Sequence, residues 1–491
     1  GQGIEFDYGC VHCVWALKEG GYDAIIINNN PETVSTDFDT SDRLYFEPLT
    51  VEDVLAVIDC ESPIEGIIVQ FGGQTAINLV HALTEQGVRI LGTPPDSIDA
   101  AEDRARSSAI LRREGIPSPR WVSIDRWEDL SGAVATVGFP ALLRPSYVLS
   151  GRGMVIVRTP EEVERYLAAH GHQSLDKPLL VDHFLEGAVE LDVDAVSDGE
   201  EIVSVVMEQI EECGVHSGDS CEVYPTQTIA PHVLETVERY TGELARAFGI
   251  VGLMNVQYAI EGDAVYVLEV NPRASRSVPF ASKASGIPLT SLAIQVILGR
   301  KLRDLAVPAP RTDHVSVKSV VFPFRVFPDL TPVAGPEMQS TGESMGIGRD
   351  FPTAYWKARL GGGWKELPFG RPVYVAPGSE SPELCDALAA AGCRIVEGAP
   401  GSIDAGEVSL TIVLGRSQEE IGLLQRCVTV GTPAVTTAGA VRGLVRALSA
   451  RPCDEVIAHA AGPVLGAVKN VGGIGTAREI GVHGLANDQG Q

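Results

Sequence analysis

The sequence has few basic residues, no long apolar run and no recognisable leader. Lysine and arginine total 38 against 65 aspartates and glutamates, which leaves a formal net charge of −27. A negative field of this size repels phosphate, so we expect neither nucleic acid nor an anionic membrane as a partner. No stretch of about 18 consecutive apolar residues is present, and the N-terminus has neither a charged region nor a cleavage-site pattern. We therefore predict a soluble protein of the cytoplasm.

The acidic balance has two explanations that the sequence leaves open. A salt-adapted source would favour such a surface, and an ordinary solvated acidic surface accounts for it equally well. Stability measured over a series of molar salt concentrations distinguishes them, because a salt-adapted protein loses structure at low salt.

Cysteine is scarce and scattered, with nine residues and one close pair. Cys10 and Cys13 flank His12, a grouping that can hold a metal or a redox centre. No second Cys/His pair follows at zinc spacing, so we favour a buried helix that enters the first domain. The odd number of cysteines in a chain of this kind indicates reduced thiols.

Helices and strands alternate along the first hundred residues. Apolar strands are expected at 24–27, 66–71 and 89–91, and Thr50 is a predicted N-cap for the helix that follows it. Such alternation predicts a parallel sheet whose loops open on a crevice at the carboxyl ends of the strands. Residues 1–3 look like the end of a turn whose strand is missing, so we expect a chain that begins inside a domain.

The rest of the chain divides by composition into three segments, and no internal repeat is visible. A charged amphipathic helix from Asp103 opens an α+β segment, prolines mark a connector, and a last segment again alternates strands with helices. In that last segment we predict strands at 373–376, 394–396 and 410–414. The predicted domains are 1–102, truncated at its N-terminus, 103–299, 300–365 and 366–491.

The strongest local pattern is a hairpin formed by residues 253–260 and 265–273. A set of apolar residues at even positions is predicted to share one face, and four polar residues at odd positions are predicted to share the other. A three-residue loop would place Gln257 directly opposite Glu269, with Asn271 about 6.6 Å further along the same strand. Hard oxygen donors that converge from one face suit magnesium and substrate phosphates; a hairpin with a merely wet polar face is the alternative. The apolar set is Met254, Val256, Tyr258, Ile260, Tyr266, Leu268 and Val270, and the polar set is Asn255, Gln257, Glu269 and Asn271.

A second pattern is a predicted strand that presents Arg144 and runs into a glycine loop at 150–153. Glycines let backbone amides approach phosphate oxygens, and Arg152 in the loop would neutralise their charge. The pattern predicts a phosphate contact, and a plain hairpin turn is the alternative.

A third pattern combines a strand of alternating acids with a polar loop. Glu190, Asp192 and Asp194 alternate with apolar residues and share one strand face, which is either functional or simply solvated. His216 lies in a glycine-flanked loop at 214–220, where it would hydrogen-bond a nucleotide or cap a turn.

Five runs of the sequence are long enough to indicate a family. They are Gly3-Ile4-Glu5-Phe6-Asp7-Tyr8, Asn30-Pro31-Glu32-Thr33-Val34-Ser35-Thr36-Asp37, Arg144-Pro145-Ser146-Tyr147-Val148-Leu149, His216-Ser217-Gly218-Asp219-Ser220 and Glu269-Val270-Asn271-Pro272-Arg273. With these runs the sequence closely resembles the large subunit of carbamoyl phosphate synthetase, in its second, C-terminal half. The resemblance is nearly continuous from the first residue to about residue 360. Tyr147, Ser217 and the run 276–280 favour the second half over the related first half.

The resemblance implies an α/β architecture and a reaction. The expected parts are a parallel-sheet pre-ATP-grasp domain like the N-terminal domain of biotin carboxylase, an ATP-grasp α+β domain, a helical connector and a methylglyoxal-synthase-like α/β domain. The expected activity is that of a ligase: carbamate and ATP give carbamoyl phosphate and ADP, the last step of a glutamine-hydrolysing synthesis for arginine and pyrimidines. Phosphoryl transfer needs positioning and charge neutralisation rather than a protein nucleophile. A lid at 150–154 would exclude water from the labile carbamate.

The resemblance also implies roles for individual residues. Arg273 and Arg276 would steady the transferred phosphoryl group and the carbamate as catalytic residues. Gln257, Glu269 and Asn271 would bind magnesium or manganese, with two ions expected and potassium as an additional candidate. The implied ATP-binding set is Arg144, His183, Leu185, Glu190, Gly214, Val215, His216, Ser217, Gln257 and Glu269.

The chain lacks two parts of the complete synthetase, namely the first synthetase half and the glutaminase small subunit, and both are expected partners. Residues 366–491 resemble the regulatory domain of the family only loosely. The strand at 432–436 and the helix at 438–448 match that domain, whereas the glycine-containing tail at 462–491 does not. A nucleotide effector is therefore less well supported than the other ligands.

An ornithine-type effector is a further expected ligand, because Glu211, Asp219 and Glu343 stand at matching positions. Two rival hypotheses for the chain stay open. One is another ATP-grasp acyl-phosphate ligase, of the biotin carboxylase or purine-synthesis kind, and the other is a non-catalytic regulatory or scaffold module with a retained nucleotide pocket.

Overall fold

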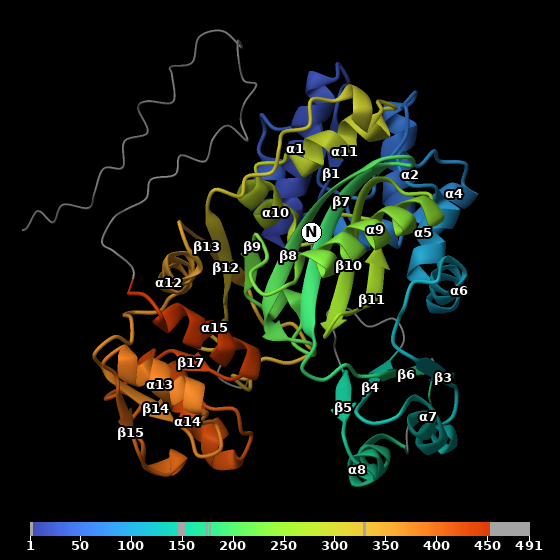
Figure 1. Cartoon of the computed structure of the whole chain (residues 1–491). Helices are drawn as coiled ribbons and strands as arrows, with labels where there is room; N and C mark the ends of the chain where they lie inside the picture. The colour runs from blue at the N-terminus through green and yellow to red at the C-terminus, as the bar shows by residue number, and fades with distance from the viewer. Residues whose placement is uncertain (1–2, 146–152, 172–174, 176–177, 328–329, 452–491) are drawn as a thin grey trace, which may run out of the picture.

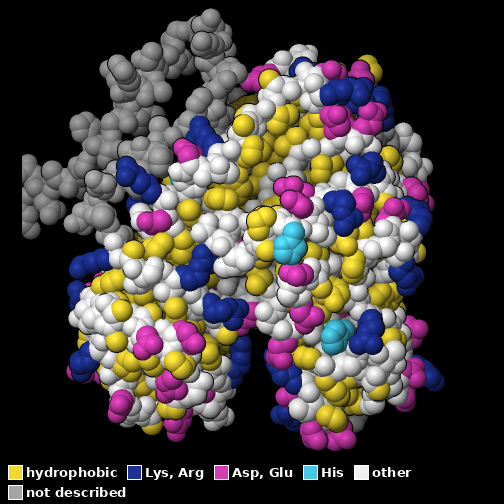
Figure 2. Space-filling view, viewed as in Figure 1, with side chains coloured by type: hydrophobic (Ala, Val, Ile, Leu, Met, Phe, Trp, Pro, Cys, Tyr) yellow, Lys and Arg dark blue, Asp and Glu magenta, His cyan; other side chains and the backbone are white. Residues whose placement is uncertain are grey.

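The computed structural model describes residues 3–145, 153–171, 175, 178–327 and 330–451. A long, twisted sheet forms the centre of the molecule, with the N-terminal elements and helices α10 and α11 above it in Figure 1. A small lobe with β3 to β6 lies at the lower right, and the C-terminal elements lie at the lower left. In Figure 2 these two lower lobes are separated by an open gap beneath the main body.

The N-terminal part has little regular sheet. Strands β1 and β2 pair in parallel, and one parallel bridge joins Ile67 to Ile90. The predicted strands at 66–71 and 89–91 are therefore reduced to that bridge. The physical reason is that Gln70 bonds elsewhere: its backbone oxygen accepts from the Ala274 amide at 2.9 Å, and its side chain accepts from the Leu253 amide at 3.1 Å. The elements are α1 (Ile4–Glu19), β1 (Ile25–Ile27), η1 (Val34–Thr36), β2 (Arg43–Tyr45), α2 (Val51–Glu61), α3 (Gly73–Ile77), α4 (Val80–Glu85) and α5 (Pro95–Glu102).

Two local predictions for this part are confirmed. Thr50 caps α2 by accepting a hydrogen bond from the Asp53 amide. Cys10 and Cys13 lie on α1, where Cys13 is buried and packs with Phe71 in an apolar core. Burial raises the pKa of the Cys10 thiol to about 12, so this thiol is unreactive and the buried-helix interpretation holds.

The small lobe is an antiparallel sheet in the order β3-β6-β4-β5 with two helices packed on it. It follows α6, which Asp103 caps by accepting from the Arg106 amide. The elements are α6 (Arg104–Glu114), β3 (Trp121–Ile124), η2 (Trp127–Asp129), α7 (Leu130–Val137), β4 (Ala141–Pro145), β5 (Val155–Val157), α8 (Pro160–His170) and β6 (Leu179–His183).

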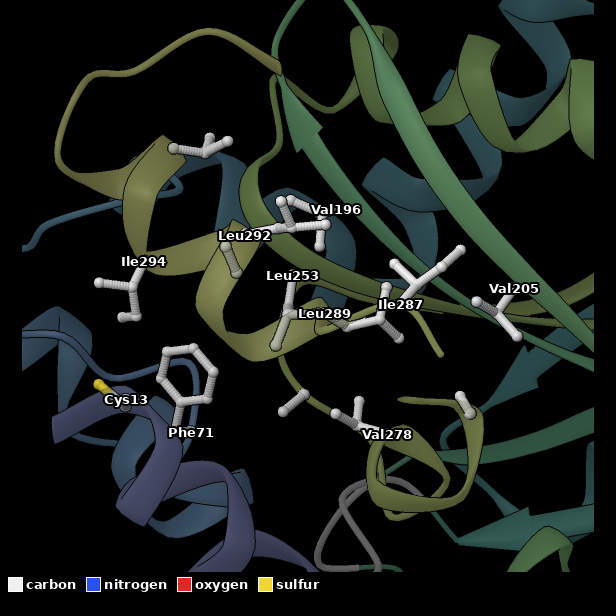
Figure 3. Packing of buried hydrophobic residues seen from close by; sticks show 14 of the residues in the cluster. Cys13, Phe71, Val196, Val205, Leu253, Val278, Ile287, Leu289, Leu292 and Ile294 are labelled. Atoms are coloured by element: carbon white, nitrogen blue, oxygen red, sulfur yellow. The ribbon is translucent and has the colours of Figure 1, made fainter. Parts of the chain in front are cut away.

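The central sheet is antiparallel, in the order β11-β10-β7-β8-β9-β12-β13. Helix α9 packs on one face, and α1, α10 and α11 pack on part of the other. Figure 3 shows Val196 and Leu253 of the sheet beside Leu289 and Leu292 of α11. The elements are β7 (Val189–Asp198), β8 (Ile202–Glu212), η3 (Ser217–Asp219), β9 (Glu222–Tyr224), α9 (Pro231–Ala247), β10 (Val251–Glu261), β11 (Ala264–Asn271), α10 (Val278–Ser285), α11 (Leu289–Ile297), η4 (Leu302–Asp304), β12 (Val315–Val321) and β13 (Gly342–Gly348).

The predicted hairpin is β10 and β11, and Gln257 does lie opposite Glu269. The route to that pairing differs from the prediction. Glu261 pairs with Ala264, which leaves a two-residue loop, and a β-bulge in β11 then shifts the register by one residue before Glu269. The bulge falls at Leu268. As a result Tyr266 and Leu268 do not share the core of Met254 and its neighbours, and their predicted place on that face is wrong.

The C-terminal part is a parallel sheet in the order β15-β14-β16-β17. The strands predicted at 373–376, 394–396, 410–414 and 432–436 are all present, within a residue or two at their ends. A shared apolar core joins this sheet and α12 to β9 and β12 of the central sheet. The elements are α12 (Phe351–Gly361), β14 (Pro372–Val375), α13 (Pro382–Ala390), β15 (Arg394–Val396), η5 (Pro400–Ser402), β16 (Leu410–Ile412), α14 (Gln418–Val430), β17 (Ala434–Val435) and α15 (Ala438–Leu448).

Within the described residues, every helix is either too short or too polar to cross a membrane.

Candidate nucleotide and metal site

Two rows of polar side chains cross β11, β10 and β7 on the face of the central sheet opposite α9. Neighbouring positions within each row are cross-strand partners, whose Cβ atoms lie about 4.5–5.5 Å apart. The six side chains therefore form one polar surface. The first row is Glu269, Gln257 and Asp192, and the second row is Asn271, Asn255 and Asp194.

The outer side chains of the rows contact one another. The Asn271 Nδ2 donates to Glu269 Oε1 at 2.8 Å and to Asn255 Oδ1 at 3.4 Å. The Gln257 Nε2 donates to Ser217 Oγ at 2.9 Å. The structure thus brings Gln257, Glu269 and Asn271, the predicted metal ligands, to one place.

The chemistry of these donors fits a hard divalent cation. They supply one carboxylate and two amide oxygens, which are the ligand types that magnesium takes when substrate phosphates complete its shell. Among the described residues no group of three or more His, Cys, Asp and Glu side chains is placed to hold a metal. A cation held here would therefore depend on the amide oxygens of Gln257 and Asn271 as well as on Glu269.

The inner ends of both rows are buried acids. Asp192 is 2% exposed and Asp194 is fully buried, so the solvated-strand interpretation of these positions is wrong. Burial raises the pKa of Asp194 to about 6 and raises the pKa of Asp192 as well. Both carboxyl groups are retained inside the sheet by hydrogen bonds from neighbouring side chains.

The two predicted catalytic arginines follow β11 and are held differently. The Arg273 guanidinium donates to Asn271 Oδ1 and to Gln74 Oε1, both at 3.3 Å. Burial lowers the pKa of Arg273, although Glu102 and Glu269 oppose that shift. Arg276 pairs with Glu5 at 3.3 Å, so α1 of the N-terminal part also contributes to this side of the site.

The predicted nucleotide residues on the small lobe lie at the ends of β4 and β6. Arg144 is 3.9 Å from Asp182, which also pairs with Arg104. His183 ends β6, and its Nδ1 is buried with no hydrogen-bond partner among the described residues. Because β4 and β6 are antiparallel, His183 lies opposite Ala141 and Arg144 lies opposite Leu180, at the other end of the pair. The orphaned ring nitrogen of His183 is suited to an incoming polar ligand.

A loop after β8 carries the remaining nucleotide residues. The Gly214 amide donates to Glu190 Oε1 at 3.4 Å, and burial raises the pKa of Glu190 to about 8. A Cβ at Gly214 would come within 2.7 Å of the Phe184 ring, and its φ of +100° also favours glycine. His216 Nδ1 accepts from the Gly218 amide at 3.0 Å, and burial lowers the pKa of His216. The neighbouring Val215 is buried.

An apolar cluster beside this loop was missed by the sequence analysis, with the exception of Leu185. It joins residues of the small lobe to residues of β10 and β11 and borders Glu190 and Gly214. A planar, apolar-faced ligand group would match such a surface. Because the bulge at Leu268 changes which face the residues of β11 occupy, the alternation of apolar and polar residues does not predict this cluster. Its members are Leu142, Ile156, Phe184, Leu185, Ala188, Cys213, Ala259, Tyr266 and Leu268.

Two of the three predicted effector residues are engaged with the protein itself. Glu211 accepts from Ser220 Oγ at 2.9 Å and lies 3.7 Å from the buried Arg359. Asp219 accepts from two backbone amides at 2.8 Å each, at residues 339 and 340. Glu343 lies on β13, where burial raises its pKa. The ornithine prediction thus concerns carboxylates of which two already have internal partners.

Two predicted features lie outside the described residues. They are the loop at 150–152, which includes Arg152, and the tail at 462–491. A concavity of about 600 Å³ on the small lobe, lined by Val122, Asp125, Arg126 and neighbours, contains none of the predicted site residues.

Comparison with solved structures defines the class of protein. The fold matches the biotin carboxylase domain of Hydrogenobacter thermophilus 2-oxoglutarate carboxylase with a TM-score of 0.57 at 17% identity, over 72% of this chain and 86% of that one. It also matches N5-carboxyaminoimidazole ribonucleotide synthetase from Thermus thermophilus with a TM-score of 0.56 at 19% identity, over 75% of this chain and 98% of that one. The chain therefore has the ATP-grasp fold of these enzymes.

Sequence comparison gives the family. Residues 1–100 match the carbamoyl phosphate synthase preATP-grasp domain, and residues 103–305 match the ATP-binding domain of the carbamoyl-phosphate synthase L chain. The chain is 44% identical to the C-terminal section of the carbamoyl phosphate synthase large chain of Methanopyrus kandleri, over 91% of both. It is 46% identical to the large chain of Methanothermobacter thermautotrophicus, over 92% of this chain and 46% of that one.

The chain belongs to the carbamoyl phosphate synthase large-chain family. It corresponds to the C-terminal section, which is a separately named chain in Methanopyrus kandleri and Methanocaldococcus jannaschii. It spans about half the length of the undivided large chain that it matches in Methanothermobacter thermautotrophicus.

Proposed function

We propose that the chain phosphorylates carbamate with ATP, forming carbamoyl phosphate and ADP as the second synthetase half of its family. The observation that carries the proposal is the pairing of Gln257 with Glu269 beside Asn271, on a polar sheet face bordered by Arg273. Oxygen donors for a cation and an arginine for phosphoryl oxygens converge there, as phosphoryl transfer requires.

Each group has a role that follows from its place. Glu269, Gln257 and Asn271 would hold magnesium, which neutralises charge on the terminal phosphates when it is bound. Arg273 and Arg276 would bind the transferred phosphoryl group and the carbamate, and the apolar cluster would receive the base of the nucleotide. The remaining ATP contacts would come from Arg144, His183, Leu185, Glu190, Gly214, Val215, His216 and Ser217.

The proposal extends to ligands and partners. Manganese would replace magnesium at the same oxygen donors, two ions would be bound, and potassium would bind as an additional ion. The first synthetase half would supply carbamate, a glutaminase subunit would supply ammonia to that half, and the enzyme would work in the cytoplasm. An ornithine effector at Glu211, Asp219 and Glu343, or a nucleotide effector on the C-terminal domain, would regulate it.

The test is ATP formation from ADP and carbamoyl phosphate in the presence of magnesium. The wild-type chain should form ATP, and Glu269→Gln should reduce the rate by at least about 100-fold, since a charged group at the reacting phosphates is lost. Glu261→Gln is the matched control, because Glu261 is an exposed acid on the same hairpin. Equal rates for wild type and Glu269→Gln would contradict the proposal.

The same assay addresses the two rival hypotheses. ADP binding with no ATP formation would favour a non-catalytic module. ATP formation that requires a different acyl phosphate in place of carbamoyl phosphate would favour another ATP-grasp ligase.

A further inference from the structure

Asn255 is a buried amide with one orientation. It is 2% exposed, and it lies between the inner acids and the outer Asn271. Its Nδ2 donates to Asp194 Oδ1 at 3.0 Å and to Asp192 Oδ1 at 3.3 Å. Because a carboxylate only accepts hydrogen bonds, the amide nitrogen must face the acids, and Oδ1 must face outward.

Asn255, together with Glu269 and Arg273, holds the Asn271 amide in one orientation. The outward Asn255 Oδ1 accepts from the Asn271 Nδ2 at 3.4 Å, and Glu269 accepts from the same nitrogen at 2.8 Å. Both donor hydrogens of the Asn271 amide are thereby used. Its Oδ1 accepts from the Arg273 guanidinium, 3.3 Å away.

Gln257 is oriented in the same manner in the first row. It lies opposite the Asp192 carboxylate, its cross-strand partner, and its Nε2 donates to Ser217 Oγ at 2.9 Å. With the nitrogen engaged by Ser217, the Gln257 Oε1 is left for another ligand.

The two acids are themselves held in place. Asp194 accepts from Ser275 Oγ at 2.6 Å and from Ser277 Oγ at 2.8 Å, and both serines belong to the turn that carries Arg276. Asp192 accepts from Gln209 Nε2 at 2.7 Å. Among the described residues, neither acid has an ion-pair partner within 4 Å. Both acids accept their hydrogen bonds from neutral amides and hydroxyls.

We propose that Asp192 and Asp194 are positioning residues that orient the amides of Gln257 and, through Asn255, of Asn271, so that both amides present oxygen to the cation site. The inference rests on the proposed function, because it assumes that a divalent cation binds beside Glu269. An amide that turns its nitrogen to a cation repels it, whereas the oxygen binds it. Asp192 and Asp194 thus set the sign of the partial charge at two of the three ligand positions without touching the ion.

The experiment is a titration of the full chain with Mn²⁺ alone and with Mn²⁺ and ADP, followed by electron paramagnetic resonance. Asp192→Asn and Asp194→Asn keep the shape of each side chain and add a donor, which allows the neighbouring amide to turn over. Outer partners of metal ligands typically change metal affinity by about 10–100-fold, and we expect a weakening of Mn²⁺ binding in that range for each variant. ADP binding measured without metal should change by less than about threefold.

A further variant separates positioning from a general loss of structure. Asp198→Asn is the matched control, since Asp198 is a buried acid on β7 whose side chain accepts from backbone amides at residues 200, 201 and 302. It should leave Mn²⁺ affinity unchanged.

The outcomes are distinguishable. Mn²⁺ affinity in Asp192→Asn and Asp194→Asn that equals the wild-type value would overturn the inference and leave the proposed function standing. A wild-type chain that binds no Mn²⁺, even with ADP, would overturn the proposed function and the inference together.

Discussion

Glu190 and Asp194 illustrate how the central sheet treats its acids at the scale of single residues. Both are carboxyl groups at buried positions, where loss of water penalises the charged form and raises the pKa, to about 8 for Glu190 and about 6 for Asp194. Glu222 on β9 is likewise buried, and its pKa is also raised to about 8. Buried acids of the central sheet therefore contribute to the pH dependence of stability.

Glu190 gives a pH prediction at this scale. Its pKa is raised on folding, so its contribution to stability is fully present below about pH 4.5 and is lost as the pH rises through about 8. Between pH 5 and 8.5, Glu190 should lower the free energy of unfolding of the wild type by on the order of 3 kcal/mol. Glu190→Gln should remove this decrease, so its free energy of unfolding should change less with pH. Urea unfolding of both proteins across this range measures the difference. Parallel pH profiles would contradict the assignment, because every other acid is common to the two proteins.

The β10–β11 hairpin shows, at the scale of an element, what a sequence pattern can and cannot predict. Alternation of apolar and polar residues predicted both strands. The pair Gln257–Glu269 was predicted from a three-residue loop, whereas the structure forms it through a two-residue loop and a bulge. The alternation did not reveal the bulge at Leu268, because an extra residue changes the parity of a strand without changing its composition. Consequently the polar half of the site was predicted, and the apolar cluster with Leu268 was not.

Other predictions from the sequence were wrong because the residues that determine the local structure are distant in the sequence. The predicted strand at 66–71 is short because Gln70 bonds Leu253 and Ala274, about two hundred residues further on. The burial of Asp192 and Asp194 depends on Asn255 and on the turn after β11. The spacing of these acids in the sequence predicts that they share a strand face. Whether that face is exposed to solvent depends on the elements that pack against it in the assembled sheet.

The bulge leads to a prediction for nucleotide affinity. Leu268→Ala removes an apolar surface proposed to contact the base, and should weaken ADP binding by about tenfold while Mn²⁺ affinity stays unchanged. Val267→Ala is the control, since Val267 is the preceding residue and packs in the core on the opposite face. It should lower stability and leave ADP affinity as it is. Isothermal titration calorimetry measures both, and equal ADP affinities for Leu268→Ala and wild type would exclude Leu268 from the base site.

At the scale of the whole molecule, the C-terminal part is fixed to the strand that precedes the nucleotide loop. Glu212, the last residue of β8, accepts hydrogen bonds from the Ala438 amide at 3.1 Å and from the Gly439 amide at the start of α15. A carboxylate at a helix N-terminus is favoured by the exposed amides and the helix dipole. Gly439 and Gly443 allow this approach, because a Cβ on either would come within 2.5 Å of Ile210.

The acidic surface is also a property of the whole molecule. Whether it reflects adaptation to salt stays a prediction. Figure 2 shows acidic and basic side chains interspersed on the visible face. The net charge of −27 is therefore distributed rather than gathered in one patch on that face. A response of stability to molar salt still decides between a salt-adapted and an ordinary acidic protein.

The contact of Glu212 with α15 predicts coupling between the C-terminal part and nucleotide binding. Glu212 is followed within two residues by Gly214, whose amide bonds Glu190, so a change at the helix contact reaches the nucleotide loop through the backbone. Glu212→Ala should weaken ADP binding by about fivefold, at the lower end of typical coupling between sites. Glu420→Gln is the matched control, because Glu420 caps α14 inside the C-terminal part and contacts no residue of the central sheet among the described hydrogen bonds. Glu420→Gln should lower the stability of that part, measured by urea unfolding, without changing ADP affinity. If Glu212→Ala binds ADP as wild type does, the two parts share a core and act independently at the nucleotide site.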